Sequence, residues 1–166
     1  MSQEIDWHKL SGNLSIASTL SALGWLRSDD LPYVAADAIA NGMDSPALRE
    51  LAGTSASDAT EVGIELLTRV MSELALHPAS PCAARLAVAR QIAAAILDGT
   101  VAERVGTRRI YFALGDFGDD ECDAVKARWL EFDDAFDRLT YDIPAHRPDL
   151  AELHRSVRAA AADLFG

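Results

Sequence analysis

One stretch of the chain constrains the fold more than any other. Residues 81–99 read PCAARLAVARQIAAAILDG, which is alanine-rich and apolar on nearly every side. Before Asp98, only Arg85, Arg90 and Gln91 are clearly polar, and these three interrupt the run enough to favour a core helix over a membrane span. A helix this apolar needs cover from other helices. We therefore expect residues 81–98 to form the central helix of an all-α fold.

The rest of the chain also reads as helices. Asn13 is suited to capping a helix that ends before Gly24, and two short segments carry the order of cap, proline and closing glycine. Gly63 lies inside a longer helix and predicts close approach by another helix. No repeat, low-complexity tract or linker divides the 166 residues, so we expect a single compact domain over 1–166 with about seven or eight helices. The expected helices lie within 13–23, 28–42, 44–53, 58–76, 81–98, 107–114, 124–140 and 149–164.

Residues 107–114, TRRIYFAL, admit two interpretations. Their β-branched and aromatic content is typical of a strand. A lone strand would have no partner, because the chain holds no second run with a period of two. We therefore predict a helix that ends near Gly115.

The charge of the chain limits its partners. Asp and Glu number 26 against 15 Lys and Arg, for a formal charge of −11. Such a charge opposes binding to nucleic acids or to an anionic membrane surface, because phosphates are repelled. It suits a basic protein partner, although acidic surfaces also serve solubility alone.

Acidic residues are densest between Asp116 and Asp142. The spacing does not fit a calcium-binding loop, and acids at a helix start also stabilise its positive end. We expect no metal site. An acidic face flanked by aromatic side chains would suit a basic partner through electrostatic complementarity. The predicted partner-binding residues are Asp119, Asp120, Glu121, Trp129, Asp133 and Asp134.

Arginines gather in one stretch. Arg104, Arg108 and Arg109 lie beside two aromatic residues, and they are the predicted ligand-binding residues for a phosphate or a carboxylate. The plainer interpretation is that these arginines pair with the protein's own acids.

Cys82 is the best single candidate for a nucleophile, because it lies at the start of a helix, where the dipole lowers a thiol pKa. Against that role, cysteine is usually buried and nothing in the spacing aims His77 at it. Two cysteines in a chain of this length do not suggest a disulfide framework. No phosphate-binding glycine loop, nucleophile elbow or paired glutamate–histidine motif is present, so we expect no cofactor.

Two stretches resemble uncharacterised small proteins of high-GC actinobacteria. The first runs from Leu31 to Gly53 and contains DSPALRELAG, and the second runs from Ile96 to Ile110. The resemblance implies a compact all-helical protein with no assigned activity, and it transfers no functional residue.

These observations predict a non-enzymatic, all-α protein that acts by binding another protein, for example as an immunity or antitoxin-like domain for a basic partner. The alternatives are a small-molecule or ion-binding helical domain and a cysteine-dependent enzyme using Cys82. A homodimer anchored by Trp7 or Trp129 is a further expectation, and core packing of these tryptophans is the alternative. The N-terminus lacks the pattern of a secretory signal, so the cytoplasm is the expected location.

Overall fold

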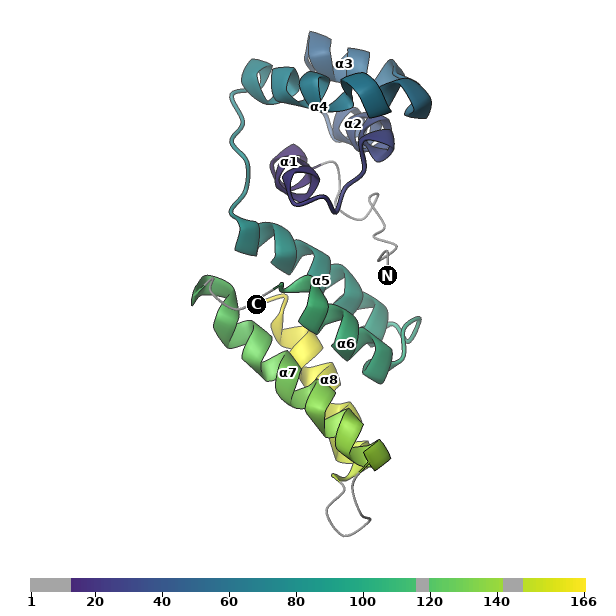
Figure 1. Ribbon diagram of the computed structural model, residues 1–166, viewed down its shortest axis with the longest axis vertical. Helices are drawn as coiled ribbons and strands as arrows, with labels where there is room; N and C mark the ends of the chain where they lie inside the picture. The colour runs from purple at the N-terminus through teal and green to yellow at the C-terminus, as the bar shows by residue number, and fades with distance from the viewer. Residues whose placement is uncertain (1–12, 116–119, 142–147) are drawn as a thin grey trace. The chain divides into compact units, whose positions relative to one another are not determined.

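The computed structural model describes residues 13–115, 120–141 and 148–166; for Asp120 and Glu121 it describes the backbone only. Across these ranges the chain forms eight α-helices and one 3-10 turn, with no strand (Figure 1). The prediction of an all-α fold is confirmed. The elements are α1 (Leu14–Ala22), η2 (Ser28–Asp30), α2 (Leu31–Ala40), α3 (Pro46–Gly53), α4 (Ala56–Glu73), α5 (Pro81–Leu97), α6 (Glu103–Ala113), α7 (Asp120–Tyr141) and α8 (Leu150–Asp163).

Contacts divide the chain into two compact units. The N-terminal unit spans Glu4–Ala84 and the C-terminal unit contains Arg85–Gly166, so the first residues of α5 count with the N-terminal unit. The single domain over 1–166 therefore stays a prediction. Along the described ranges, no helix combines the length and the apolar character needed to cross a bilayer.

Side-chain caps start α1 and α3 in the N-terminal unit, whereas Asp30 before α2 makes no side-chain cap hydrogen bond. The Asn13 carboxamide oxygen accepts from the backbone N–H of Ile16 at 3.2 Å, and the Ser45 hydroxyl accepts from that of Leu48 at the same distance. Ser55 caps α4, which therefore begins earlier than the predicted start at residue 58. Because each cap satisfies a backbone donor that the helix itself cannot, helices as short as α3 are stabilised.

Gly63 explains how α4 packs in this unit. A β-carbon on Gly63 would lie 3.2 Å from Cδ1 of Leu31 and 3.3 Å from the carbonyl oxygen of Ser28. Ser28 belongs to the 3-10 turn and Leu31 opens α2, so this turn passes directly over the glycine. The predicted close approach at Gly63 is confirmed.

Helix α5, Pro81–Leu97, confirms the helix predicted over residues 81–98, but its cover is uneven. Val88, Ala89, Ala93 and Ile96 are buried along one stripe, whereas Leu86 and other apolar residues are half-buried. The two arginines of α5 contact different parts of the chain. The Arg90 Nε donates to the carbonyl oxygen of Leu164 at 2.6 Å, and the Arg85 side chain lies against the backbone of Gly115.

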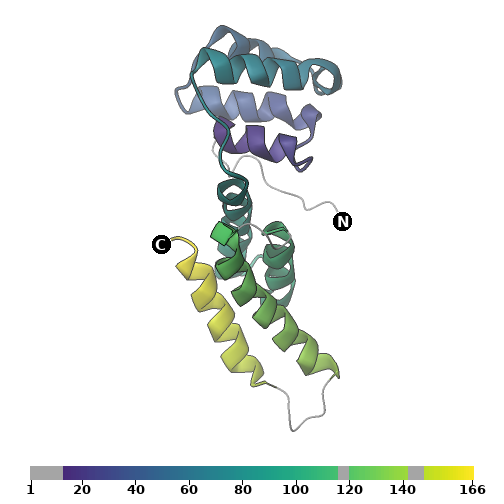
Figure 2. The same cartoon turned by 60° about the vertical axis from the view of Figure 1, so that its left-hand side comes forward.

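Helices α6 and α7 test two further predictions from the sequence. Residues 107–114 lie mostly in α6, so the helical prediction for TRRIYFAL is confirmed over the strand. Helix α7 begins at Asp120, four residues before the predicted start at Ala124. Helices α7 and α8 run beside each other in both ribbon views (Figure 2).

Candidate functional site

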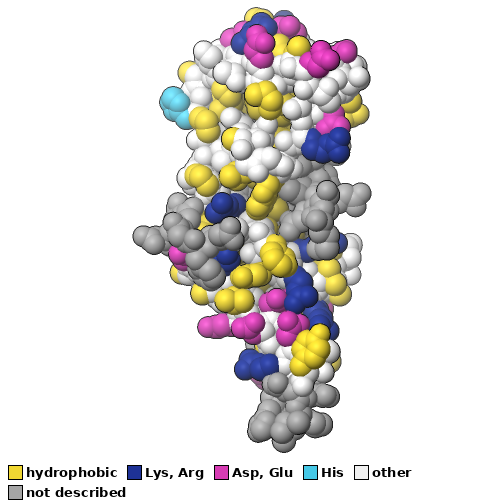
Figure 3. Space-filling view, in the orientation of Figure 1, with side chains coloured by type: hydrophobic (Ala, Val, Ile, Leu, Met, Phe, Trp, Pro, Cys, Tyr) yellow, Lys and Arg dark blue, Asp and Glu magenta, His cyan; other side chains and the backbone are white. Residues whose placement is uncertain are grey.

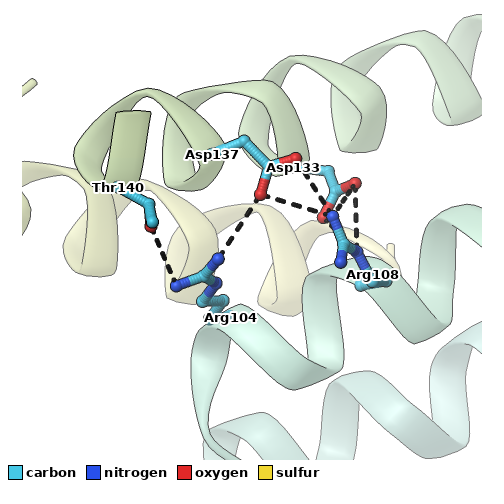
Figure 4. Close-up of polar contacts among 5 residues, drawn as sticks. All are labelled: Arg104, Arg108, Asp133, Asp137 and Thr140. Atoms are coloured by element: carbon cyan, nitrogen blue, oxygen red, sulfur yellow. Dashed lines mark hydrogen bonds and ion pairs between the residues drawn. The ribbon is translucent and has the colours of Figure 1, made fainter. Parts of the chain in front are cut away.

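Helices α6 and α7 are joined by a ladder of arginines and aspartates (Figure 4). Arg108 donates from Nε to Asp133 at 3.1 Å and from Nη2 to Asp137 at 3.1 Å. One turn earlier, Arg104 reaches Asp137 at 3.4 Å and the Thr140 hydroxyl at 3.3 Å. The arginines lie four residues apart on α6 and the aspartates four apart on α7, so each pair faces the other helix.

The two rungs of this ladder differ in burial. The Asp133 side chain is 12% exposed, whereas that of Asp137 is 38% exposed. A hydrogen bond from Arg108 to Asp133, followed by their charge attraction, raises the pKa of the Arg108 guanidinium above its usual value. Because Asp133 is nearly buried, its charge depends on Arg108 for compensation.

This ladder decides how the arginine stretch is used. Arg104 and Arg108, which the sequence nominated for ligand binding, are engaged by acids of α7, as in the plainer interpretation. Arg109 is exposed and also interacts within the chain. The structure therefore joins one residue nominated for ligand binding, Arg108, to one nominated for partner binding, Asp133, in a single ion pair.

The residues nominated for partner binding do not form one surface. Asp119 lies outside the described residues, and Asp120 and Glu121 open α7 with side chains that are not described. Trp129 is only 1% exposed and packs edge-on against Phe132, with ring centroids 5.8 Å apart. Trp129 is therefore a core residue of this unit and is not available to a partner. Trp7, the other predicted dimer anchor, also lies outside the described residues.

Asp134 is the nominated residue that remains on the surface. It lines an open hollow of about 520 Å³, whose described lining comes entirely from α7: Glu131, Asp134, Asp137, Arg138 and Tyr141. Among the residues that the structure describes, neither Glu131 nor Asp134 has a hydrogen bond or ion pair. Tyr141 is 81% exposed.

We call Glu131, Asp134, Arg138 and Tyr141 the α7 face. Of these, only Asp134 is a predicted site residue; Glu131, Arg138 and Tyr141 are not. The four residues are spaced by three, four and three positions, which places them on one side of a helix. Helical periodicity alone could have separated these residues from Asp133 and Asp137, which face α6. Figure 3 shows acidic and basic side chains close together on the visible side of this unit.

A second polar cluster lies where α5 ends. Arg158 of α8 donates to the carbonyl oxygens of Ile96 at 2.8 Å and Leu97 at 2.6 Å. Its guanidinium also meets Glu103 at 3.4 Å, and Nδ1 of His154 lies 3.3 Å from the other oxygen of Glu103. The cluster ties α5, α6 and α8 together, and it satisfies terminal carbonyls that a helix leaves without intrahelical partners.

The cysteines correct one expectation. Cys82 and Cys122 are both disulfide-bonded, and neither is a free thiol. A disulfide sulfur is not the thiolate that a cysteine nucleophile requires. The hypothesis of a cysteine-dependent enzyme therefore loses its nucleophile, and the cysteines are oxidised although their number did not suggest a disulfide framework. Within the described ranges, no group of three or more His, Cys, Asp or Glu residues is arranged to hold a metal ion.

Comparison of the chain with protein-family models, with curated proteins and with solved structures finds no match.

Proposed function

We propose that this protein is a non-enzymatic helical binding domain that takes a basic protein segment on the α7 face. The observation that carries the proposal is that Glu131 and Asp134 line an exposed hollow without partners of their own among the described residues. The other acids of this helix that face α6, Asp133 and Asp137, are already engaged by arginines.

The chemistry of the α7 face fits a cationic side chain. Two carboxylates three residues apart lie on the same side of the helix and can share one guanidinium or ammonium group. The ring of Tyr141 offers a surface over which a cation is attracted. The overall charge of −11 adds attraction at long range, which speeds the encounter with a basic partner. An immunity or antitoxin-like role is one concrete version of this proposal.

The proposed location differs from the first expectation. Disulfides persist in oxidising compartments and are rare in the cytosol. Because both cysteines are disulfide-bonded, we do not include the cytoplasm in the proposal.

Binding of a labelled lysine- and arginine-rich peptide, followed by fluorescence anisotropy, tests the α7 face. The double variant E131K/D134K should raise the Kd for the peptide by about tenfold or more, since two attractive charges become repulsive. The control variant E61K/E65K makes the same change in net charge at exposed positions of α4.

The control should retain most of the affinity, because only the long-range attraction changes. Equal losses in the two variants would mean that the peptide responds to net charge alone, and would contradict a specific site on α7. If the wild-type protein does not bind the peptide at low salt, the proposal is contradicted outright.

A further inference from the structure

Two apolar side chains of α6 are exposed beside the contact between α6 and α7. Val105 is 48% exposed and Phe112 is 56% exposed. At 3.6 residues per turn, the buried Thr107 lies about 100° around the helix from Arg108. Phe112 and Val105 lie on the other flank of Arg108, at about 40° and about 60°. We call Val105 and Phe112 the α6 edge. Arg109 is not included, because it lies farther around the helix and already interacts within the chain.

The α7 face lies in the corresponding place on its own helix. Phe136 is 2% exposed and lies about 100° around α7 from Asp137. Asp134 and Tyr141 lie on the other flank of Asp137, at about 60° and about 40°. Since Asp137 points toward the arginines of α6 (Figure 4), these two side chains lie on the solvent side of the arginine–aspartate ladder.

Helices α6 and α7 run antiparallel. From Arg104 to Arg108 the chain advances one turn along α6, whereas the contacts of these arginines step back one turn along α7, from Asp137 to Asp133. In an antiparallel pair that packs on one core, the flanks that follow the facing residues turn to the same side. The α6 edge and the α7 face therefore lie side by side on one outer surface.

The carboxylates of the α7 face lie between the two ends of the α6 edge. At one end, Phe112 adjoins Tyr111, and Nζ of Lys126 lies 5.1 Å from the centroid of the Tyr111 ring. At the other end, Val105 lies beside the contact that Asp137 makes with the neighbouring arginine of α6. Residues 131 and 134 of α7 lie between residues 126 and 137, so both carboxylates are level with the space between the two apolar side chains.

This surface carries negative charge between two apolar side chains. Glu131 and Asp134 have no hydrogen bond or ion pair among the described residues, and two acids against one arginine, Arg138, leave the α7 face with a formal charge of −1. The ladder beside it adds no net charge, because its arginines and aspartates cancel. The side chains of the α6 edge are seven residues apart, which is about 10 Å along the helix. The surface therefore fits an occupant with apolar side chains two helical turns apart and positive charge between them.

We propose that the partner of the α7 face is a basic amphipathic helix of another protein, which lies along α6 and α7 with its apolar side on the α6 edge. Amphipathic helices dock through apolar anchors at positions i, i+3, i+4 and i+7, and the spacing of the α6 edge matches the first and last of these. Basic side chains three and four positions after the first anchor then face Glu131 and Asp134. This inference rests on the proposed function, since it uses the same face of α7, and it adds the apolar pattern of the partner.

Charge argues against a second copy of this chain as the occupant. Each chain has a formal charge of −11, so two copies repel each other at long range, whereas a basic helix is attracted. Sedimentation velocity of the protein alone detects a dimer if one forms.

Two peptides of identical composition test the pattern of the partner. One carries leucines at positions i and i+7 with arginines at i+3 and i+4, within a helix of alanine and lysine, and the other is its scrambled isomer. In fluorescence anisotropy, the wild-type protein should bind the patterned peptide with a Kd about tenfold or more below that of the scrambled peptide. Equal affinities for the two peptides would overturn the inference.

Substitutions on the α6 edge test where the apolar side of the peptide lies. Phe112→Ser should remove most of the preference for the patterned peptide and leave the affinity for the scrambled peptide nearly unchanged. Tyr33→Ser is the matched control and should keep the preference, because Tyr33 is 55% exposed on α2, outside this surface. Circular dichroism melting checks that each variant is folded.

If Phe112→Ser does not fold, Val105→Ser takes its place and should reduce the preference by about threefold or more. A folded variant of the α6 edge that keeps the full preference would overturn the inference.

The two peptides also separate this inference from the proposed function. If both bind equally and E131K/D134K weakens both, the proposed function stands and the amphipathic partner is refuted. If neither peptide binds, both are refuted. A dimer of the protein alone that Phe112→Ser disrupts would assign the α6 edge to a second copy, and would also overturn the inference.

Discussion

Gly106 of α6 lies so close to Ile96 of α5 that a β-carbon on the glycine would stand 2.4 Å from Cγ1 of the isoleucine. Ile96 is fully buried, so its side chain has little room to move away. The close packing of these two helices therefore depends on the missing side chain at position 106.

Gly106→Ala should lower the free energy of unfolding by about 1–2 kcal/mol. Overpacking typically costs 1–3 kcal/mol, and the better helix propensity of alanine returns up to about 1 kcal/mol. Urea denaturation measures the change. Gly53→Ala, where no atom lies within 4 Å of the new β-carbon, should leave stability equal or slightly higher. A Gly106→Ala variant as stable as the wild type would show that α5 and α6 can separate freely.

Arg108→Met should destabilise the protein more than Arg104→Met. Removing Arg108 leaves the nearly buried carboxylate of Asp133 without its main partner, which we expect to cost roughly 1–3 kcal/mol. Arg104 pairs at 3.4 Å with the more exposed Asp137, and such surface pairs contribute about 0–1 kcal/mol. Unfolding in urea should show this order. The Arg108→Met/Asp133→Asn double variant should recover part of the loss, and no recovery would count against the ion pair as the cause.

Arg158→Ala should weaken the C-terminal end of α5. The guanidinium donates to two carbonyl oxygens of that end, and their loss should cost about 1–3 kcal/mol. Arg155→Ala on the same helix removes only an exposed pair with Glu152 and should change stability by less than about 0.5 kcal/mol. Hydrogen exchange would locate the effect: faster exchange near residues 93–97 in Arg158→Ala alone is the expected result.

Protonation of Glu103 should lower the free energy of unfolding in acid. Its own backbone N–H, then the Arg158 guanidinium and the charge of His154, hold the pKa of this carboxyl below its usual value. A lowered folded-state pKa contributes stability above the unfolded value of roughly 4.3, and that contribution is lost as pH falls through the folded value.

Unfolding free energies of the wild type and Glu103→Gln, measured between roughly pH 3 and pH 7, check this. The advantage of the wild type should be largest near neutral pH and should shrink below about pH 4. The exposed Glu152→Gln variant is the control. A difference between wild type and Glu103→Gln that does not vary with pH would contradict the assignment.

Local signals in the sequence predicted most of the helices. Asn13, Ser45 and Asp149 do cap α1, α3 and α8, because a cap needs only a side-chain oxygen two or three residues before its donor. The sequence also indicated that Gly63 is crowded. It did not place the start of α7, since residues 120–123 lack an apolar pattern and depend on tertiary packing for their helical form.

The candidate site was less accessible from sequence. Charge density does not single out three residues of the α7 face, Glu131, Arg138 and Tyr141, because a count of acids does not say on which side of the helix each residue lies. The sequence analysis assigns Trp129 to a partner surface because aromatic residues are enriched at interfaces. Periodicity places Trp129 on the same side as Phe136, which is also buried, and this could have corrected the expectation.

By itself, the sequence determined the helical class of the protein, the caps at Asn13, Ser45 and Asp149, and the alanine-rich helix at residues 81–97. These follow from spacings within a few residues, where backbone hydrogen bonding and helical periodicity dominate. Only the tertiary structure decided which charges are satisfied. Asp133 and Asp134 are adjacent in the chain, yet Asp133 is held by Arg108, 25 residues away, and Asp134 faces an open hollow. The identity of a partner across such a distance depends on how α6 packs against α7, which local sequence does not encode.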